Sequence, residues 1–247
     1  MFMGMGMPIP DLSNLPGNSR PGRPGGGGGG PTVQQVANKY SFKFDNSSSS
    51  YMEIDNFVED FVTEANTNQG MSVSVWFKTS SISVNYYLFG TGTSQHGAFT
   101  AQASGSNPRW TLRDTSGSQY ILTTTDSPIA PGGWYHVVYT WDATASVNDR
   151  MKIYIDGVLN ESTTIAGPTS LRASGTYVNS KGLINAYREQ PLNSSSSDTT
   201  IDELGLFTRT LNADEVIAIY NATSLNTTAN LATLSTGAPY AWYRMGD

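Results

Sequence analysis

Apolar and polar residues alternate through much of the middle of the chain. The stretch 71–78 (MSVSVWFK) repeats with period two, which predicts a half-buried strand. The run 134–141 (WYHVVYTW) is apolar on both sides and predicts a central strand. Further short strands are predicted at 40–45, 51–54, 86–91, 98–103, 109–113, 120–124, 151–155 and 158–165. Strands that recur about every 8–12 residues, with few helices, predict a β-sandwich.

Local signals add a hairpin and two helical segments to this pattern. Asp156-Gly157 lies between two predicted strands and indicates a type I′ turn. In 201–221 (IDELGLFTRTLNADEVIAIYN) an alternating strand leads into a short helix, with Asn212 as N-cap and Glu215 completing a capping box. The segment 32–40 (TVQQVANKY) has its apolar residues at helical spacing, so we expect a helical turn or two there.

Composition limits the possible partners. Only 14% of the 247 residues are charged, and the net charge of −6 argues against a nucleic-acid surface. The chain has no cysteine, which excludes disulfides and thiolate chemistry and is typical of a microbial, viral or reducing-cytoplasm origin. It contains no apolar run long enough to span a membrane, and its first residues do not resemble a secretory signal.

Residues 1–31 differ in composition from the rest. Prolines and the run Gly25–Gly30 predict a flexible arm that packs no core of its own. The arm is either a tether or a segment that orders only against a neighbouring subunit. Methionines at its tip suit docking into a partner's groove.

Five segments, in this order, resemble laminin-G-like, concanavalin-A-like modules. They are 40–54 (YSFKFDNSSSSYMEI), 71–80 (MSVSVWFKTS), 132–142 (GGWYHVVYTWD), 151–160 (MKIYIDGVLN) and 201–220 (IDELGLFTRTLNADEVIAIY). The resemblance implies an all-β jelly-roll sandwich with a short C-terminal helix. The expected division is an arm at 1–31, the jelly-roll domain at 32–222 and a tail with a terminal strand at 223–247.

The cysteine-free polar composition, the arm, the entry NKYSFKFDN at 38–46 and the ending PYAWYRMGD at 239–247 resemble modules in virion proteins of tailed phages, marine ones in particular. This resemblance implies a virion protein assembled in the host cytoplasm. The terminal strand either folds back beside the chain's own sheet or adds to a neighbour's sheet, and the natural chain could also continue. Residues 1–31 and 239–247 are the candidates for contacts with other virion proteins and for homo-oligomerisation.

Three acids imitate a catalytic cluster. Glu53, Asp55 and Glu59 follow the E-x-D-x-x-x-E spacing of a glycoside hydrolase family with the concanavalin-A-like fold, in which a nucleophile and an acid flank the sugar bond. Here the cluster lies at an expected edge strand near the start of the domain, so a solvated strand and turn is the competing interpretation. The two histidines, His96 and His136, have no nucleophile or metal-binding partner in sequence, and His136 is expected in the core.

Ligand and metal candidates are weaker. Rings in or beside loops could stack on a sugar, although core packing is the favoured role of each: Tyr86, Tyr87, Trp110, Tyr120, Tyr177 and Tyr187. The resemblance also implies a calcium ion held by Asp45 and Asp202, where related modules often bring acids together.

The sequence therefore predicts a non-enzymatic virion structural or decoration protein with glycan recognition as its candidate activity. Two alternatives stay open, a stand-alone carbohydrate-binding or adhesion module and a glycoside hydrolase of the same fold.

Overall fold

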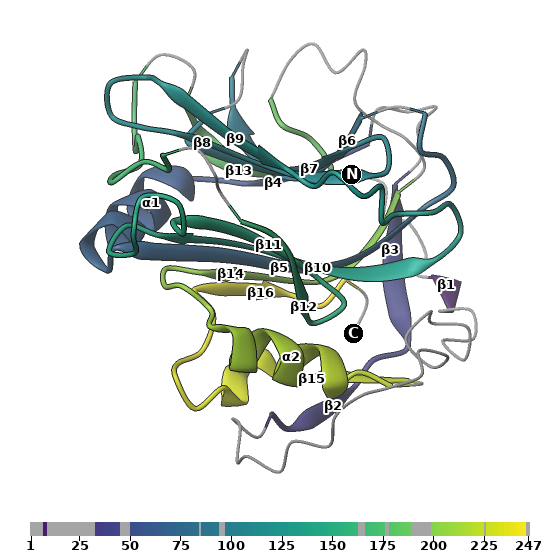
Figure 1. The fold of residues 1–247 in the computed structure, drawn as a ribbon. Helices are drawn as coiled ribbons and strands as arrows, with labels where there is room; N and C mark the ends of the chain where they lie inside the picture. Colours follow the sequence, from purple (N-terminus) through teal and green to yellow (C-terminus); the bar gives the residue numbers. More distant parts are fainter. Residues whose placement is uncertain are drawn as a thin grey trace.

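The computed structural model of the chain describes residues 7–8, 33–44, 50–83, 85–93, 97–162, 166–175, 178–188, 199–224 and 226–245. Two antiparallel sheets stack face to face, and a two-stranded sheet and a helix lie on the far side of one of them (Figure 1). The larger sheet has the order β1-β3-β14-β5-β10-β11-β12, with β16 also paired to β14. The smaller has the order β4-β13-β6-β7-β8-β9. The predicted all-β sandwich is confirmed.

The strands are β1 (Met7–Pro8), β2 (Gln35–Ala37), β3 (Tyr40–Phe44), β4 (Met52–Ile54), β5 (Gly70–Thr79), β6 (Asn85–Gly92), β7 (Phe99–Ser104), β8 (Asn107–Arg113), β9 (Gln119–Thr123), β10 (Trp134–Asp142), β11 (Met151–Ile155), β12 (Val158–Ser162), β13 (Val178–Ile184), β14 (Thr199–Phe207), β15 (Thr227–Ala229) and β16 (Ala241–Tyr243). The α-helices are α1 (Val58–Thr67) and α2 (Ala213–Asn221), and a short 3₁₀ helix spans Leu231–Thr233.

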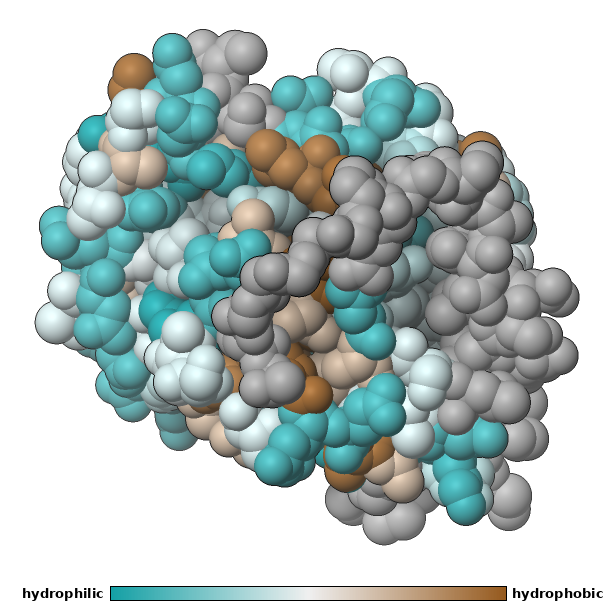
Figure 2. Space-filling view, turned by 60° about the horizontal axis from the view of Figure 1, so that its bottom comes forward, coloured by the Kyte–Doolittle hydropathy of each residue, from teal (hydrophilic) through white to brown (hydrophobic). Residues whose placement is uncertain are grey.

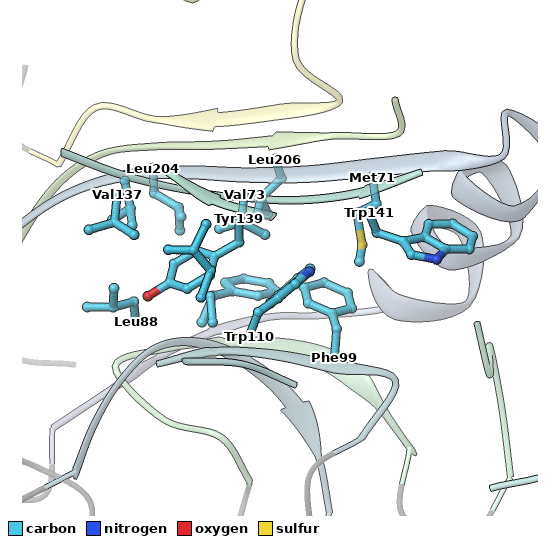
Figure 3. Packing of buried hydrophobic residues seen from close by; sticks show 14 of the residues in the cluster. Met71, Val73, Leu88, Phe99, Trp110, Val137, Tyr139, Trp141, Leu204 and Leu206 are labelled. Atoms are coloured by element: carbon cyan, nitrogen blue, oxygen red, sulfur yellow. The ribbon is translucent and has the colours of Figure 1, made fainter. Parts of the chain in front are cut away.

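The core fills the space between the two large sheets. Aromatic rings from both sheets meet there, with Trp110 of β8 between Phe99 of β7 and Tyr139 of β10 (Figure 3). The ring centroids of Trp110 and Tyr139 lie 5.4 Å apart. Burying each such side chain stabilises the fold by about 1.5–3 kcal/mol, so this layer of rings holds the two sheets together.

A second apolar cluster covers the outer face of the larger sheet. It joins Val138 and Tyr154 of the sheet to Val216 and Ile219 of α2. Strand β5 is consequently buried on both faces, and the half-buried strand predicted at 71–78 is wrong in this respect. Seen from the α2 side, the surface carries separate hydrophobic patches among hydrophilic residues (Figure 2).

The predicted hairpin and capped helix are both confirmed. Asp156 and Gly157 have φ values of 50° and 81°, the left-handed geometry that a type I′ turn requires. At the start of α2 the Asn212 side chain accepts from the Glu215 N–H at 2.9 Å, and the Glu215 carboxylate accepts from the Asn212 N–H at 3.0 Å. The sequence signal and the structure agree because both depend on local contacts only.

The helical turn predicted at 32–40 is wrong. Residues 35–37 form β2, which pairs antiparallel with β15. Ala37 lies opposite Thr227, and the Gln35 amide donates to the Ala222 carbonyl at 2.6 Å. A helix this short is marginal in water, whereas pairing with β15 satisfies the same backbone groups.

Helix α1 was missed by the sequence interpretation. Val58, Phe61, Val62 and Ala65 are fully buried and have the spacing of one helical face. The apolar residues at 58–65 have helical spacing in the sequence, but the neighbouring acids favoured an interpretation as an edge strand and a turn.

Strand β14 contains a bulge that breaks its predicted alternation. The register with β5 shifts between Asp202 and Gly205, and Glu203 has a φ of 49°. The side chains of Asp202 and Glu203 therefore both lie on the outer side of the larger sheet, where they are buried, while Ile201 and Leu204 both enter the core.

The terminal strand folds back onto its own sheet, which confirms the first of the alternatives for 239–247. Strand β16 pairs with Leu204–Leu206 of β14, next to the stretch 199–201 that β3 occupies. The two short strands thus share one edge of β14.

Candidate functional site

A groove of about 220 Å³ opens between the loop after β9 and the β11–β12 hairpin. It is comparable in size to one sugar unit. Its lining combines carboxylate, amide, aromatic and aliphatic groups: Asp126, Pro128, Tyr135, Ile155, Asp156, Val158 and Asn160. The described lining contains two acids and no basic residue, so the groove suits a neutral or cationic ligand. Sugar sites combine apolar surface with a few placed polar groups, and this groove has both.

A bulge in β12 places the amide of Asn160. Ile153 lies opposite Glu161 and Tyr154 opposite Leu159, so Asn160 is the extra residue between them. Such bulges re-aim a side chain, and here the Asn160 Nδ2 donates to Asp126 Oδ2 at 2.9 Å. The Asn160 Oδ1 is buried without a hydrogen-bond partner among the described residues. One carboxylate and one free amide oxygen are thus brought together at the groove.

The remaining polar groups of the groove are held by backbone contacts. The Tyr135 hydroxyl accepts from the Ala130 N–H at 3.0 Å, which fixes the loop that carries Asp126. The Asp156 carboxylate accepts from the His136 N–H at 3.0 Å, which fixes the hairpin. Val158 is 55% exposed in the same lining. The groove therefore has a rigid floor and an open, partly apolar side.

None of these groove residues was a sequence candidate. Asp156 was recognised as a turn residue only, and Asn160 lies in a predicted strand. The signal that could have pointed to Asp126 is the polar loop 124–128 beside that hairpin. Only the folded chain shows that the two segments meet.

The predicted ligand-binding rings occupy different environments. Trp110 and Tyr86 are completely buried, and the Tyr86 hydroxyl donates to the Gly105 carbonyl at 2.6 Å. Burial raises the pKa of the Tyr86 hydroxyl. A ring without exposed surface cannot stack on a ligand, so these two belong to the core.

The other predicted rings lie nearer the surface. Tyr120 is half-buried and donates to Asp114 Oδ2 at 3.0 Å. Tyr87 and Tyr187 are brought together, with ring centroids 4.3 Å apart on the outer side of the smaller sheet. Tyr177 lies outside the described residues.

The acids of the hydrolase-like spacing do not form a cleft. Glu53 lies on the edge strand β4 and pairs with Lys181 at 2.7 Å, and the same Lys181 lies 3.8 Å from Asp55. The hydrogen bond from Lys181 lowers the pKa of Glu53, whereas a catalytic acid needs a raised one. Glu59 is exposed on the first turn of α1. This arrangement fits the solvated strand and turn.

Asp202 belongs to a buried polar network. Its carboxylate accepts from the Asn38 Nδ2 at 2.8 Å, and the same Nδ2 lies 2.9 Å from Glu203 Oε1. The Trp242 Nε1 donates to Glu203 Oε2 at 2.6 Å. A cavity of about 20 Å³ adjoins this network, enough for about one water molecule.

The calcium prediction gains no ligand set from this network. Asp45 lies outside the described residues. Within the described ranges, no three acidic or imidazole side chains converge as a metal site would require. Calcium binding by Asp45 and Asp202 stays a prediction.

His136 is completely buried, as expected from its place in a central strand. Its Nε2 lies 2.9 Å from Ser74 Oγ, and its ring stacks on Trp76 with centroids 5.1 Å apart. Burial lowers its pKa to about 3, so the ring is neutral at physiological pH. His96 lies outside the described residues.

The comparison with protein families identifies the class of this protein. Residues 44–217 match the concanavalin A-like lectin/glucanases superfamily, and the chain belongs to that superfamily. This confirms the concanavalin-A-like resemblance. A search of curated proteins gave no match. No helix of the described part is both long and apolar enough to cross a membrane.

Solved structures with this fold include binding domains of botulinum neurotoxins. The receptor-binding domain of the C/D mosaic serotype is 19% identical with a TM-score of 0.54, covering 79% of this chain and 45% of that one. The serotype C1 binding domain is 16% identical with a TM-score of 0.55, covering 79% and 47%. A structure of type C, whose cell entry depends on two ganglioside molecules, is 15% identical with a TM-score of 0.54 and the same coverage.

At this level of identity the likeness shows the fold alone. The chain spans less than half the length of these neurotoxin domains.

Proposed function

We propose that this protein is a non-enzymatic carbohydrate-binding module that holds a neutral sugar in the groove between the β9–β10 loop and the β11–β12 hairpin. The observation that carries the proposal is the groove of about 220 Å³ in which the Asn160 amide orients the Asp126 carboxylate. A sugar hydroxyl can donate to the exposed Asp126 carboxylate. Val158 and Pro128 supply apolar surface for the ring's carbon face.

Two further observations support binding rather than catalysis. Of the acids with the hydrolase-like spacing, Glu53 and Asp55 contact Lys181. None of the three acids belongs to the described groove lining. The type C neurotoxin domain that shares this fold interacts with gangliosides, which are sugar-bearing lipids.

Glycan-array screening followed by calorimetry tests the proposal. The wild-type protein is expected to bind a neutral oligosaccharide. Asp126→Asn should weaken binding by about tenfold or more because it removes the charge from the acceptor of the ligand's hydroxyl, and Asn160→Ala should weaken it because Asp126 loses the amide that orients it. Asp149→Asn is the matched control, because the Asp149 carboxylate accepts from the Ser146 hydroxyl at 2.6 Å and lies outside the described groove lining.

Equal loss in the control, or release of reducing ends from the bound oligosaccharide, contradicts the proposal. The first result would place the effect outside the groove, and the second would favour the hydrolase alternative.

The virion setting, the homo-oligomer and the attachment role of residues 1–31 and 239–247 stay predictions from the sequence. Ordered contacts of these segments with other chains in a map of the assembled particle would support them.

A further inference from the structure

The groove beside the β11–β12 hairpin carries a carboxylate that is open to solvent. Asp126, in the loop between β9 and β10, is exposed and belongs to the groove lining. Its Oδ2 accepts the hydrogen bond from the Asn160 Nδ2 at 2.9 Å, whereas its Oδ1 accepts none from the residues that the structure describes. A carboxylate has about four lone-pair sites, so Asp126 has room for donors from a ligand.

The negative charge of Asp126 is not offset by a neighbouring cation in the described part of the chain. It forms no ion pair there, and the described lining holds a second acid, Asp156, but neither lysine nor arginine. The chain as a whole carries a net charge of −6. The local carboxylates and the field of the whole protein therefore both favour a positively charged group in the groove.

The apolar side of the groove favours an organic cation over a metal ion. Val158 is 55% exposed in the lining, and Pro128 is half-buried beside it. Aliphatic groups of this kind contact the carbon face of a sugar but cannot replace the hydration shell of a hard cation. Calcium takes about six to eight oxygen ligands, whereas the described lining offers two carboxylates and one amide.

A sugar that carries a protonated amine matches both features of the groove. A primary ammonium group has three N–H donors and a positive charge, whereas a hydroxyl at the same ring position has one donor and no charge. A hydrogen bond from the ammonium to a carboxylate is charge-assisted and roughly twice as strong as a bond between neutral groups. The Asp126 carboxylate therefore distinguishes an amino sugar from its neutral counterpart.

We infer that the groove selects sugars that carry a primary ammonium group, such as glucosamine units. This inference rests on the proposed sugar site and names its ligand more closely. The ammonium donates to Asp126, which Asn160 holds in position, while Val158 and Pro128 contact the carbon face of the ring. Neutral sugars bind the same groove more weakly, because they lack the charge-assisted hydrogen bond.

Calorimetry with fully deacetylated chitotetraose and with cellotetraose tests this inference. The two probes share the same β-1,4-linked chain and differ at the 2-position, which carries an ammonium group in one and a hydroxyl in the other. At about pH 6 the amino form is expected to bind about fivefold or more tighter. At about pH 9 the amines have lost their protons, so the difference between the two sugars should shrink.

The ratio of the two affinities assigns the selection to Asp126. Asp126→Asn keeps the shape of the acceptor but removes its charge, so the ratio should fall close to one whatever the variant does to neutral binding. Asp149→Asn is the matched control, because Asp149 is also an exposed acid but lies outside the described groove lining. This control should keep the wild-type ratio within about twofold.

The inference is overturned if the two sugars bind equally at about pH 6, if Asp126→Asn keeps the ratio, or if Asp149→Asn loses it. It also fails if spermidine, which has ammonium groups but no ring, binds as tightly as the amino sugar. Equal binding of the two sugars would leave the proposed function standing, because cellotetraose would still occupy the groove. If neither sugar binds, this inference fails, and the glycan array alone decides the proposed function.

Discussion

At the scale of single residues, burial decides the chemistry of His136. The ring stacks on Trp76 and contacts Ser74, and no charged side chain of the described part compensates a proton on it. Its pKa falls to about 3 through desolvation alone. His136 is thus a core hydrogen-bonding residue, as its position in an apolar strand predicted.

This depressed pKa predicts a loss of stability in acid. In the unfolded chain His136 takes up a proton near its ordinary value of 6.5, whereas the folded protein resists protonation down to about 3. The unfolded state therefore binds more protons in this window, and the free energy of unfolding falls by about 1.4 kcal/mol per pH unit below 6.5. Urea midpoints measured between pH 7.5 and 4 check this.

His136→Gln is expected to flatten the pH dependence, because the amide can still contact Ser74 but does not titrate. Equal slopes in wild type and His136→Gln would contradict the assignment.

At the scale of elements, local sequence specifies the helix ends well. Arg209 reinforces the α2 capping box by pairing with Glu215 at 2.8 Å. The cap was predictable because every group in it lies within a few residues of the others. The helical spacing at 32–40 gave a wrong prediction because the backbone partners of β2 lie about 190 residues away, in β15.

Replacing the capping residue should destabilise the protein measurably. Asn212→Ala removes the acceptor of the Glu215 N–H and is expected to lower the free energy of unfolding by about 1 kcal/mol. Asn230→Ala is the matched control, since Asn230 precedes the 3₁₀ helix without a side-chain cap bond. Thermal melts of both variants check this, and an equal loss in the two would contradict it.

Bulges explain which site residues the sequence could not reveal. The predicted strands at 158–165 and from residue 201 onward located β12 and β14, but the side chains of the extra residues Asn160 and Glu203 are oriented by pairing with the partner strands. Tyr87 and Tyr187 were candidates from their residue type. They come together only in the folded chain, where the backbone of Tyr187 lies directly against Gly90 of β6.

At the scale of the whole molecule, segments from both ends of the described chain converge on one buried acid. Asn38 and Trp242 both donate to Glu203, and Arg244 lies 3.6 Å from it. The bulge in β14 orients the Glu203 side chain toward these three residues. This network fixes β16 beside β14 and ties the entry of the domain to its closing strand.

Removing one donor from this network should loosen the fold. Trp242→Phe keeps the aromatic ring but leaves a buried oxygen of Glu203 short of its hydrogen bond, which is expected to cost about 1–3 kcal/mol. Tyr243→Phe, at the next position of β16, should change stability by no more than about 0.5 kcal/mol. Chemical denaturation of both variants checks this, and similar losses would show that Trp242 contributes only packing.

The amino-acid sequence by itself determined most strands of the two large sheets, the capped helix, the Asp156-Gly157 turn and the sandwich class, because these follow from periodicity and from contacts between near neighbours. The tertiary structure alone decided the strands β2 and β13, the groove at Asn160 and the network at Glu203. Each of these depends on strand register, which sets side by side residues that are far apart along the chain.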